Sequence, residues 1–128
     1  MASFVPFIFS LQSHLKLYHW STTSYARHKA MDELVEVFLE QSDRFVENYI
    51  AKYGRKAPFL FGKAAAGFKI AVAPLNDDTV VSFLKASIRF FTHQLPKHLN
   101  PRDDVDLLTI RDELVAALNK ARYLCTLK

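Results

Sequence analysis

Cysteine, glycine and proline are scarce in this sequence, and each shortage narrows the class of protein. The single cysteine, Cys125, excludes an intrachain disulfide and fits a reducing compartment. With only 3 glycines and 5 prolines among 128 residues, and no low-complexity tract, long regular elements are favoured over a chain of turns. We interpret Cys125 itself as a small apolar residue that fills space near the end of the chain.

A hydrophobic run long enough to cross a membrane is also missing. Such a span needs about 20 apolar residues, and the apolar stretch within residues 1–12 is far shorter. That stretch lacks the basic start and the clean cleavage site of a signal peptide. We therefore expect it to form the apolar face of a first helix, and we expect no membrane association.

Charge of one sign is not concentrated anywhere in the chain. The 17 lysines and arginines exceed the 13 aspartates and glutamates, which gives a formal net charge of +4 and a pI near 9.3. Lysines and arginines never form a run longer than two residues, so we interpret them mainly as solvated helix faces. This mild basic excess permits weak association with nucleic acid without requiring it.

Apolar residues make up half of the chain and recur at helical spacing along most of it. The pattern predicts one all-α domain, residues 1–128, with four helices over residues 4–21, 25–53, 77–95 and 101–126. The second helix would be roughly 43 Å long, a length that suits a four-helix bundle.

Caps and helix breakers set the expected boundaries. Gly54 should end the second helix, and Pro96 should stop the third. Asn100–Pro101 should start the fourth helix, where three aspartates would complement the helix dipole: Asp103, Asp104 and Asp106. The apolar segment 57–75 should form the long crossover between the second and third helices, with a short helix over residues 62–72.

The predicted second helix carries a stripe of potential metal ligands. At about 100° per residue, four such side chains fall within a sector of roughly 100°: His28, Asp32, Asp43 and Glu47. An otherwise apolar stripe should not hold these groups without a reason, because unpaired buried charges cost several kcal/mol. Asp32 and Asp43 are 11 residues apart, or roughly 16 Å along the axis, which no single metal site spans. The stripe therefore divides into two half-sites.

The two half-sites would meet if two copies of the chain paired. A second, antiparallel copy of the helix would bring the His28/Asp32 half of one copy against the other half of its partner. A two-fold axis near Val37 and Phe38 does this twice, which gives two equal sites in a homodimer. His19 and His28 are nearly equidistant from the break between the first two helices, so their rings should face each other across the hairpin.

This stretch resembles the mini-ferritins, the Dps-like family of the ferritin-like superfamily. The family's HW dipeptide matches His19–Trp20. Its H-x3-D motif matches His28 and Asp32, and its D-x3-E motif matches Asp43 and Glu47, with the 11-residue gap preserved. The longer pattern YHWSTTSYARHKAMDEL, followed by DRFVENYIAKYGR, is also similar to an uncharacterised ferritin-like group carried by large DNA viruses.

The resemblance implies a ferritin-like four-helix bundle and a di-iron ferroxidase centre shared between two subunits. The implied ligands are His19, His28 and Asp32 from one subunit and Asp43 and Glu47 from its partner, with no catalytic residue apart from them. Iron is the expected metal, and manganese or zinc would also suit mixed histidine and carboxylate ligands. The implied activity is oxidation of Fe(II) by O2 or peroxide, for iron sequestration or oxidative-stress protection. The expected assembly is a homodimer that could build a higher cage, in the cytoplasm or in a virion.

The sequence departs from the family pattern at three places. The segment between His19 and His28 is about three residues shorter, a basic N-terminal tail is missing, and segment 57–75 does not look like the family's short charged helix. We interpret three further histidines as non-ligands, and Trp20 as a packing residue at the hairpin. These histidines are His14, His93 and His98.

Three alternatives to a redox metal site stay open. The charges of the stripe could form salt bridges with Arg27, Arg44 or lysines. The protein could be a ferritin-like structural or interaction protein, for example in a virus particle, without redox activity. Its mild basic charge could also serve nucleic-acid compaction, although phosphate contacts weaken steeply with salt.

Overall fold

The computed structural model describes residues 3–62 and 72–127 and shows an all-helical protein. The helices are α1 (Phe4–Ser21), α2 (Tyr25–Tyr53), α3 (Pro58–Phe61), α4 (Val80–Arg89) and α5 (Val105–Leu124). After α4 the chain continues through a π-helical turn, η2 (Phe90–Gln94), and a 3-10 turn, η3 (Leu95–His98). The described residues contain no strand, so the predicted all-α class is confirmed.

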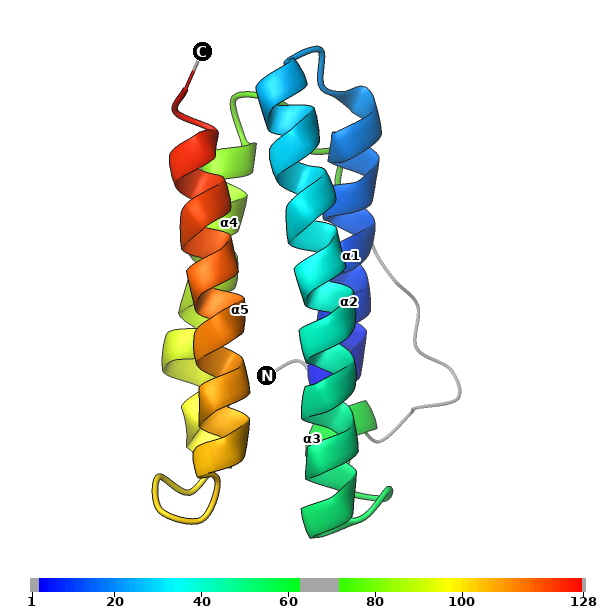
Figure 1. Ribbon diagram of the computed structural model, residues 1–128. Coiled ribbons are helices and arrows are strands. Elements are labelled where there is room, and N and C mark those ends of the chain that lie inside the picture. The colour runs from blue at the N-terminus through cyan, green and yellow to red at the C-terminus, as the bar shows by residue number, and fades with distance from the viewer. Residues whose placement is uncertain (1–2, 63–71, 128) are drawn as a thin grey trace.

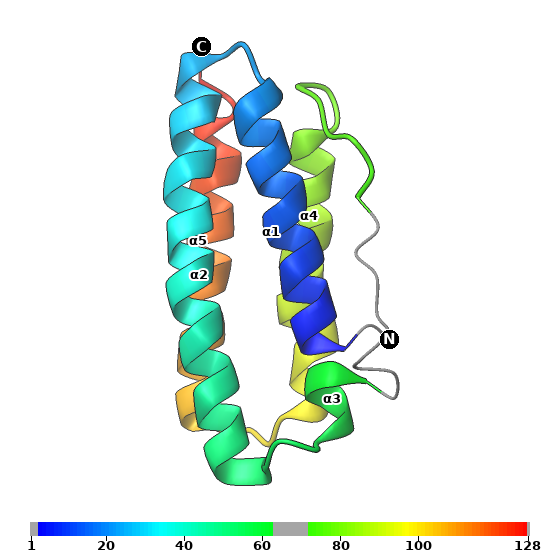
Figure 2. The same cartoon turned by 90° about the vertical axis from the view of Figure 1, so that its right-hand side faces the viewer.

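The four long helical segments lie side by side along one axis (Figures 1 and 2). α2 contacts α1 and α5, and α5 in turn contacts α4. α1 and α5 run in one direction, whereas α2 and α4 run in the other. Because α2 and α4 are parallel, the connection between them must return along the length of the molecule, whereas the other two connections are short.

Phenylalanines build much of the core between these helices. Phe4 of α1 stacks on Phe45 of α2, with ring centroids 4.3 Å apart. Phe7 stacks on Phe90 of η2 at 3.6 Å and so ties α1 to the end of the α4 segment. Full burial of one such side chain contributes about 1.5–3 kcal/mol to the free energy of unfolding, so the buried phenylalanines are a large part of the stability of this small domain.

The boundaries of α1 and α2 agree with the sequence prediction. Ser24 caps α2, because its hydroxyl accepts the Arg27 N–H at 3.3 Å. Gly54 ends α2 with a φ of +85°, a conformation that favours glycine, and donates its N–H to the Ile50 carbonyl at 2.8 Å.

The predicted third helix, residues 77–95, is wrong at both ends. It begins at Val80, because the Asn76 side chain accepts the N–H groups of Asp78 and Thr79 and holds them in a turn. Pro96 does not stop the helical path, which continues to His98 as η3. Proline has no N–H to donate, and the chain adapts with the π turn, in which the Leu95 N–H bonds to the Phe90 carbonyl.

The predicted fourth helix, residues 101–126, also begins later and ends slightly earlier, since α5 spans Val105–Leu124. The Asn100 side chain accepts the N–H groups of Arg102 and Asp103 at 2.8 and 3.1 Å, so Pro101 lies in a turn before the helix. The cap position of α5 belongs to Asp104.

The crossover between α2 and α4 contains the short helix α3, which the sequence did not predict. The short helix predicted over residues 62–72 falls on residues 63–71, which lie outside the described part of the chain. Cys125 is buried and unpaired, in agreement with a packing role. No helix among the described residues has both the length and the apolar content that a membrane crossing requires.

Candidate metal centre

The α1–α2 hairpin places two histidine rings face to face. The rings of His19 and His28 are stacked, with centroids 3.8 Å apart and planes inclined by 17°. His19 lies in the last turn of α1 and His28 in the first turns of α2. The prediction that these two rings face each other is therefore confirmed.

Reciprocal hydrogen bonds fix both rings. The His19 Nδ1–H donates to the His28 carbonyl at 2.7 Å, and the His28 Nδ1–H donates to the His19 carbonyl at 2.8 Å. Because a carbonyl oxygen can only accept, each Nδ1 must carry a proton, and in the neutral ring Nε2 then presents its lone pair. Metal-binding histidines commonly have this arrangement, with the second ring nitrogen committed to a carbonyl.

Asp32 is the third predicted ligand at this end of α2. Its Oδ1 lies 3.9 Å from the His19 Nε2, and its side chain is half-exposed whereas His19 is buried. The structure therefore brings His19, His28 and Asp32 into one neighbourhood, in which the His19 ring is buried and the Asp32 carboxylate reaches the surface.

Asp43 and Glu47 lie on the same stripe of α2, towards its far end. Both side chains are exposed, and neither makes a hydrogen bond or an ion pair with any described residue. The proposed salt-bridge partners are occupied elsewhere, since Arg27 pairs with Asp77 and Arg44 donates to Gln41. Within one chain, these two arginines therefore do not form salt bridges with Asp43 or Glu47.

One chain does not assemble all five predicted ligands. In the described ranges, no group of three or more histidine, cysteine, aspartate or glutamate side chains is arranged to hold a metal ion. The trio of His19, His28 and Asp32 is thus not by itself arranged as a metal site in the single chain. Helix geometry also separates Asp32 from Asp43 by roughly 16 Å along α2.

A partly buried polar network holds the hairpin in place. The Tyr18 hydroxyl donates to Asp77 Oδ1 at 2.6 Å, while Arg27 donates to the carbonyls of Asp77 and Cys125, both at 2.8 Å. Burial raises the pKa of the Tyr18 hydroxyl, and its bond to Asp77 raises that pKa further. The same bond, together with one from Thr22, lowers the pKa of Asp77. The network fixes the turn between the two histidines to the start of α4 and the end of α5.

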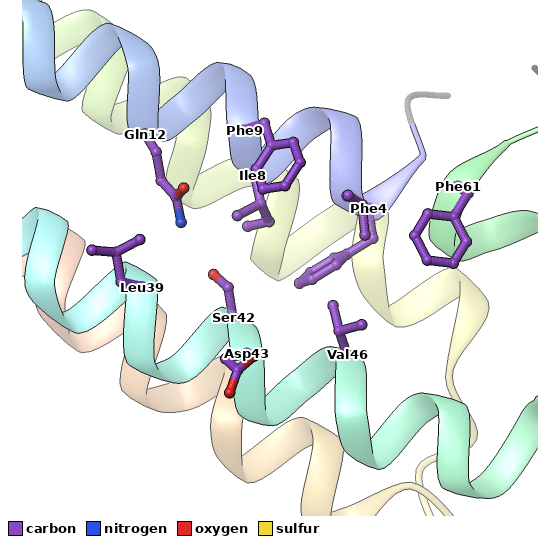
Figure 3. Close-up of a pocket in the computed structure, with 10 residues that line it drawn as sticks. Phe4, Ile8, Phe9, Gln12, Leu39, Ser42, Asp43, Val46 and Phe61 are labelled. Atoms are coloured by element: carbon purple, nitrogen blue, oxygen red, sulfur yellow. The ribbon is translucent and has the colours of Figure 1, made fainter. Parts of the chain in front are cut away.

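A pocket that the sequence did not predict opens between α1 and α2 beside Asp43 (Figure 3). It encloses about 340 Å³, and most of its lining is apolar, including Phe4, Ile8 and Val46. The Ser42 hydroxyl points from α2 towards α1, is buried and has no hydrogen-bond partner among the described residues. The only sequence signal for this pocket was a serine on the apolar side of α2.

Trp20 corrects another expectation. The expected packing of its side chain at the hairpin is wrong for the single chain, in which Trp20 is 66% exposed. The Lys16 ammonium lies 5.4 Å from the centre of its ring.

The remaining histidines have structural surroundings. The His14 Nδ1–H donates to the Ser10 carbonyl at 2.6 Å, and its Nε2 accepts the Ala73 N–H at 3.0 Å. This uses both ring nitrogens, which agrees with the interpretation of His14 as a non-ligand. His93 is exposed and bonds to Thr92, and the ring of His98 stacks on Phe59.

Comparison with known protein families gives one match, and it covers most of the chain. Residues 19–125 match the model of a family of unknown function, DUF5856. The chain belongs to this family. The matched region of the DUF5856 family starts at His19 and contains all five candidate ligands. Neither the curated proteins nor the solved structures gave a match.

Proposed function

We propose that this protein is a Dps-like mini-ferritin that pairs through α2 and binds two irons at each of two sites shared between subunits. Each site would use His19, His28 and Asp32 of one subunit with Asp43 and Glu47 of the other. Its activity would be oxidation of Fe(II) by O2 or peroxide, for iron sequestration or protection against oxidative stress.

The observation that carries this proposal is the locked histidine pair. Stacking two imidazole rings by itself adds little stability. In both rings the Nδ1–H donates to a carbonyl, so each Nε2 is left to bind another partner. This donor set fits a divalent first-row metal, because neutral nitrogen ligands and carboxylates suit iron, manganese and zinc.

The histidine and carboxylate ligands would have different roles because they differ in charge. As metal ligands, the imidazoles of His19 and His28 would hold Fe(II) without adding negative charge, whereas the three carboxylates would stabilise the Fe(III) product. The chemistry that bound iron supplies is the oxidation of Fe(II) to Fe(III) while O2 or peroxide is reduced. The chain contributes ligand orientation, through the two carbonyl bonds and the polar network behind the hairpin.

The helix topology supports the ferritin-like part of the proposal. Ferritin-like bundles have one long crossover connection, and here α2 and α4 run parallel while the neighbouring connections are short. The length of α2, 29 residues, is also more than twice the usual helix length in globular proteins.

The surface around the stripe supports pairing through α2. Phe9 and Leu39 lie on the α1–α2 face at the level of the expected two-fold axis and are 44% and 56% exposed. Exposed apolar side chains that gather on one face mark interaction sites, and a second copy of this same face would cover them.

Two measurements on the purified protein test the proposal. Sedimentation should give a dimer or a multiple of it, and elemental analysis after loading with Fe(II) should give about two irons per chain, since two sites of two irons serve two chains. Added Fe(II) should be oxidised in air faster than in buffer, as followed by the ultraviolet absorbance of the ferric product. A monomer, or a protein without iron, would contradict the proposal.

The exposed apolar face also favours a second candidate, a structural or interaction protein that keeps the dimer without the oxidation. A virion component of this kind would agree with the similarity to viral ferritin-like proteins. It predicts a stable, metal-free dimer that ignores added iron, so the two assays above separate the two functions.

A further inference from the structure

The pocket between α1 and α2 contains an unsatisfied polar group in an apolar setting. Ser42 is only 6% exposed, and its hydroxyl points into the pocket without a hydrogen-bond partner in the part of the chain that the structure describes (Figure 3). A buried hydroxyl without a hydrogen bond costs about 1–3 kcal/mol, so this atom favours an occupant that reaches it. The occupant should be mostly apolar, because the lining is, and should carry one hydrogen-bonding group.

Trp20 has the matching chemistry and is left outside the core. Its indole is a large apolar ring with a single N–H donor, and it is 66% exposed. Trp20 follows Phe9 of the pocket lining by 11 residues, so the two side chains lie within about 20° of each other around α1. The ring and the pocket therefore open on the same face of the α1–α2 hairpin.

The proposed pairing brings this ring to the partner's pocket. For His19 of one copy to share a metal with Asp43 and Glu47 of the other, the end of α1 must lie against the second half of the partner's α2. Asp43 also lines the pocket, and Trp20 is the residue next to His19. Side chains lean towards the N-terminus of their own helix, which in this antiparallel arrangement directs the indole from the level of Glu47 towards Ser42.

We propose that the indole of Trp20 from a second copy of the chain fills the pocket between α1 and α2 and donates its Nε1–H to the Ser42 hydroxyl. This rests on the dimer of the proposed function, to which it adds the contact that sets the register of the two subunits. The two-fold axis makes the contact twice, once beside each metal site. Each indole would also exclude water from the adjacent carboxylates.

Trp20 is the chain's only tryptophan, so its fluorescence reports this contact directly. We compare the metal-free protein at a concentration that gives the dimer with a diluted sample and with the variant Leu39→Asp. That variant places like charges together near the axis, and Leu39 is too exposed to be needed for folding. The dimer should emit at shorter wavelength and resist acrylamide quenching several-fold better than the monomer. A dimer whose emission and quenching match those of the monomer would overturn the proposal.

A double-mutant cycle tests the bond itself. Trp20→Phe keeps an aromatic ring, although a smaller one, and removes the N–H, while Ser42→Ala removes the acceptor with little change in volume. Each should raise the dimer Kd by at least about twofold, and the double variant should be no worse than Trp20→Phe alone. Fully additive effects would refute the bond. Trp20→Ala should raise the Kd by at least about tenfold, whereas Tyr123→Ala, an exposed aromatic on α5, should leave it unchanged.

The outcomes separate this inference from the proposed function. A dimer that buries Trp20 but takes up no iron would support the Trp20 contact and refute the ferroxidase activity. An iron-loaded dimer with an exposed Trp20 would support the ferroxidase activity and refute the contact. A protein that is monomeric at all concentrations, with and without iron, removes both.

Discussion

Carboxylates occur in two regions of this molecule with opposite surroundings. Asp104, before α5, is only 1% exposed; it accepts hydrogen bonds from the Tyr53 hydroxyl and the Asn100 N–H at 2.5 and 2.7 Å, and Lys52 lies 3.1 Å away. Asp43 and Glu47 on α2 are exposed and make no such bond with any described residue. A carboxylate satisfied within its own chain stabilises the fold. Carboxylates aligned on one face without partners are available to a ligand or a second chain.

The largest effect on stability should come from removing Asp104, whose partners form what we call the satisfied region. Asp104→Ala leaves Lys52, Tyr53 and the Asn100 N–H without their common acceptor, so the free energy of unfolding should fall by about 3–5 kcal/mol. Urea unfolding of the metal-free protein measures this. Asp43→Ala is the matched control and should change the free energy by less than about 0.5 kcal/mol. Equal losses in the two variants would remove the distinction between the regions.

The reverse should hold for metal binding. Glu47→Ala should lower iron affinity at least about tenfold, because it removes a ligand, and should leave unfolding of the metal-free protein almost unchanged. Calorimetric titration with Fe(II) under nitrogen measures the affinity. Glu113→Ala, on α5, is the control carboxylate and should bind iron like the parent. Unchanged iron binding in Glu47→Ala would exclude it as a ligand.

Acid should weaken the satisfied region selectively. Burial raises the pKa of Asp104, but the Tyr53 hydroxyl, the Asn100 N–H and Lys52 together hold it below its ordinary value. The pKa of Asp106 is likewise lowered, chiefly by Lys52. Because these values lie lower in the folded than in the unfolded state, the unfolded chain binds more protons in acid. Their stabilisation is complete above about pH 5 and is lost as the pH falls through about 4 and below.

Urea midpoints measured from pH 7 down to acid give this profile. Asp104→Asn should flatten it, because the variant cannot take up that proton. A parent profile no steeper than that of Asp104→Asn would show that Asp104 does not carry the acid sensitivity.

The smallest effect on stability should come from an exposed ion pair, which has the same charges as Lys52 and Asp104 but lacks their burial. Lys120 lies 3.5 Å from Glu33, but both side chains are about two-thirds exposed. Water and salt screen such pairs, so Lys120→Ala should cost less than about 0.5 kcal/mol of unfolding free energy. A loss comparable to that of Asp104→Ala would contradict the view that burial, not pairing, makes a carboxylate structural.

The fold was predictable where local contacts decide it. Gly54 acts within four residues of itself, and the end of α2 followed from it. The start of α5 was missed because the Asn100 side chain holds a turn where a helix cap was expected, and Asn76 holds a similar turn before α4. Asparagine serves both purposes, and spacing alone does not separate them.

The candidate site was predictable in part for the same reason. His19 and His28 flank a short break at almost equal distances, so any tight hairpin must bring them together. Their reciprocal bonds to each other's carbonyls were not predictable, since these depend on how closely α1 and α2 approach. The pocket at Ser42 was also missed, because it arises from the side chains of both helices.

By itself, the sequence determined that this protein is helical, that α2 is long and that its stripe of candidate ligands is too extended to form one site within a single helix, because each of these follows from residue spacing along one helix. Only the tertiary structure decided which charged groups are satisfied. From its place before a helix, Asp104 is expected to complement the helix dipole, yet it is the buried partner of Lys52, which lies far away in the chain. Which distant group meets a carboxylate depends on how whole helices pack, and residue order does not specify that.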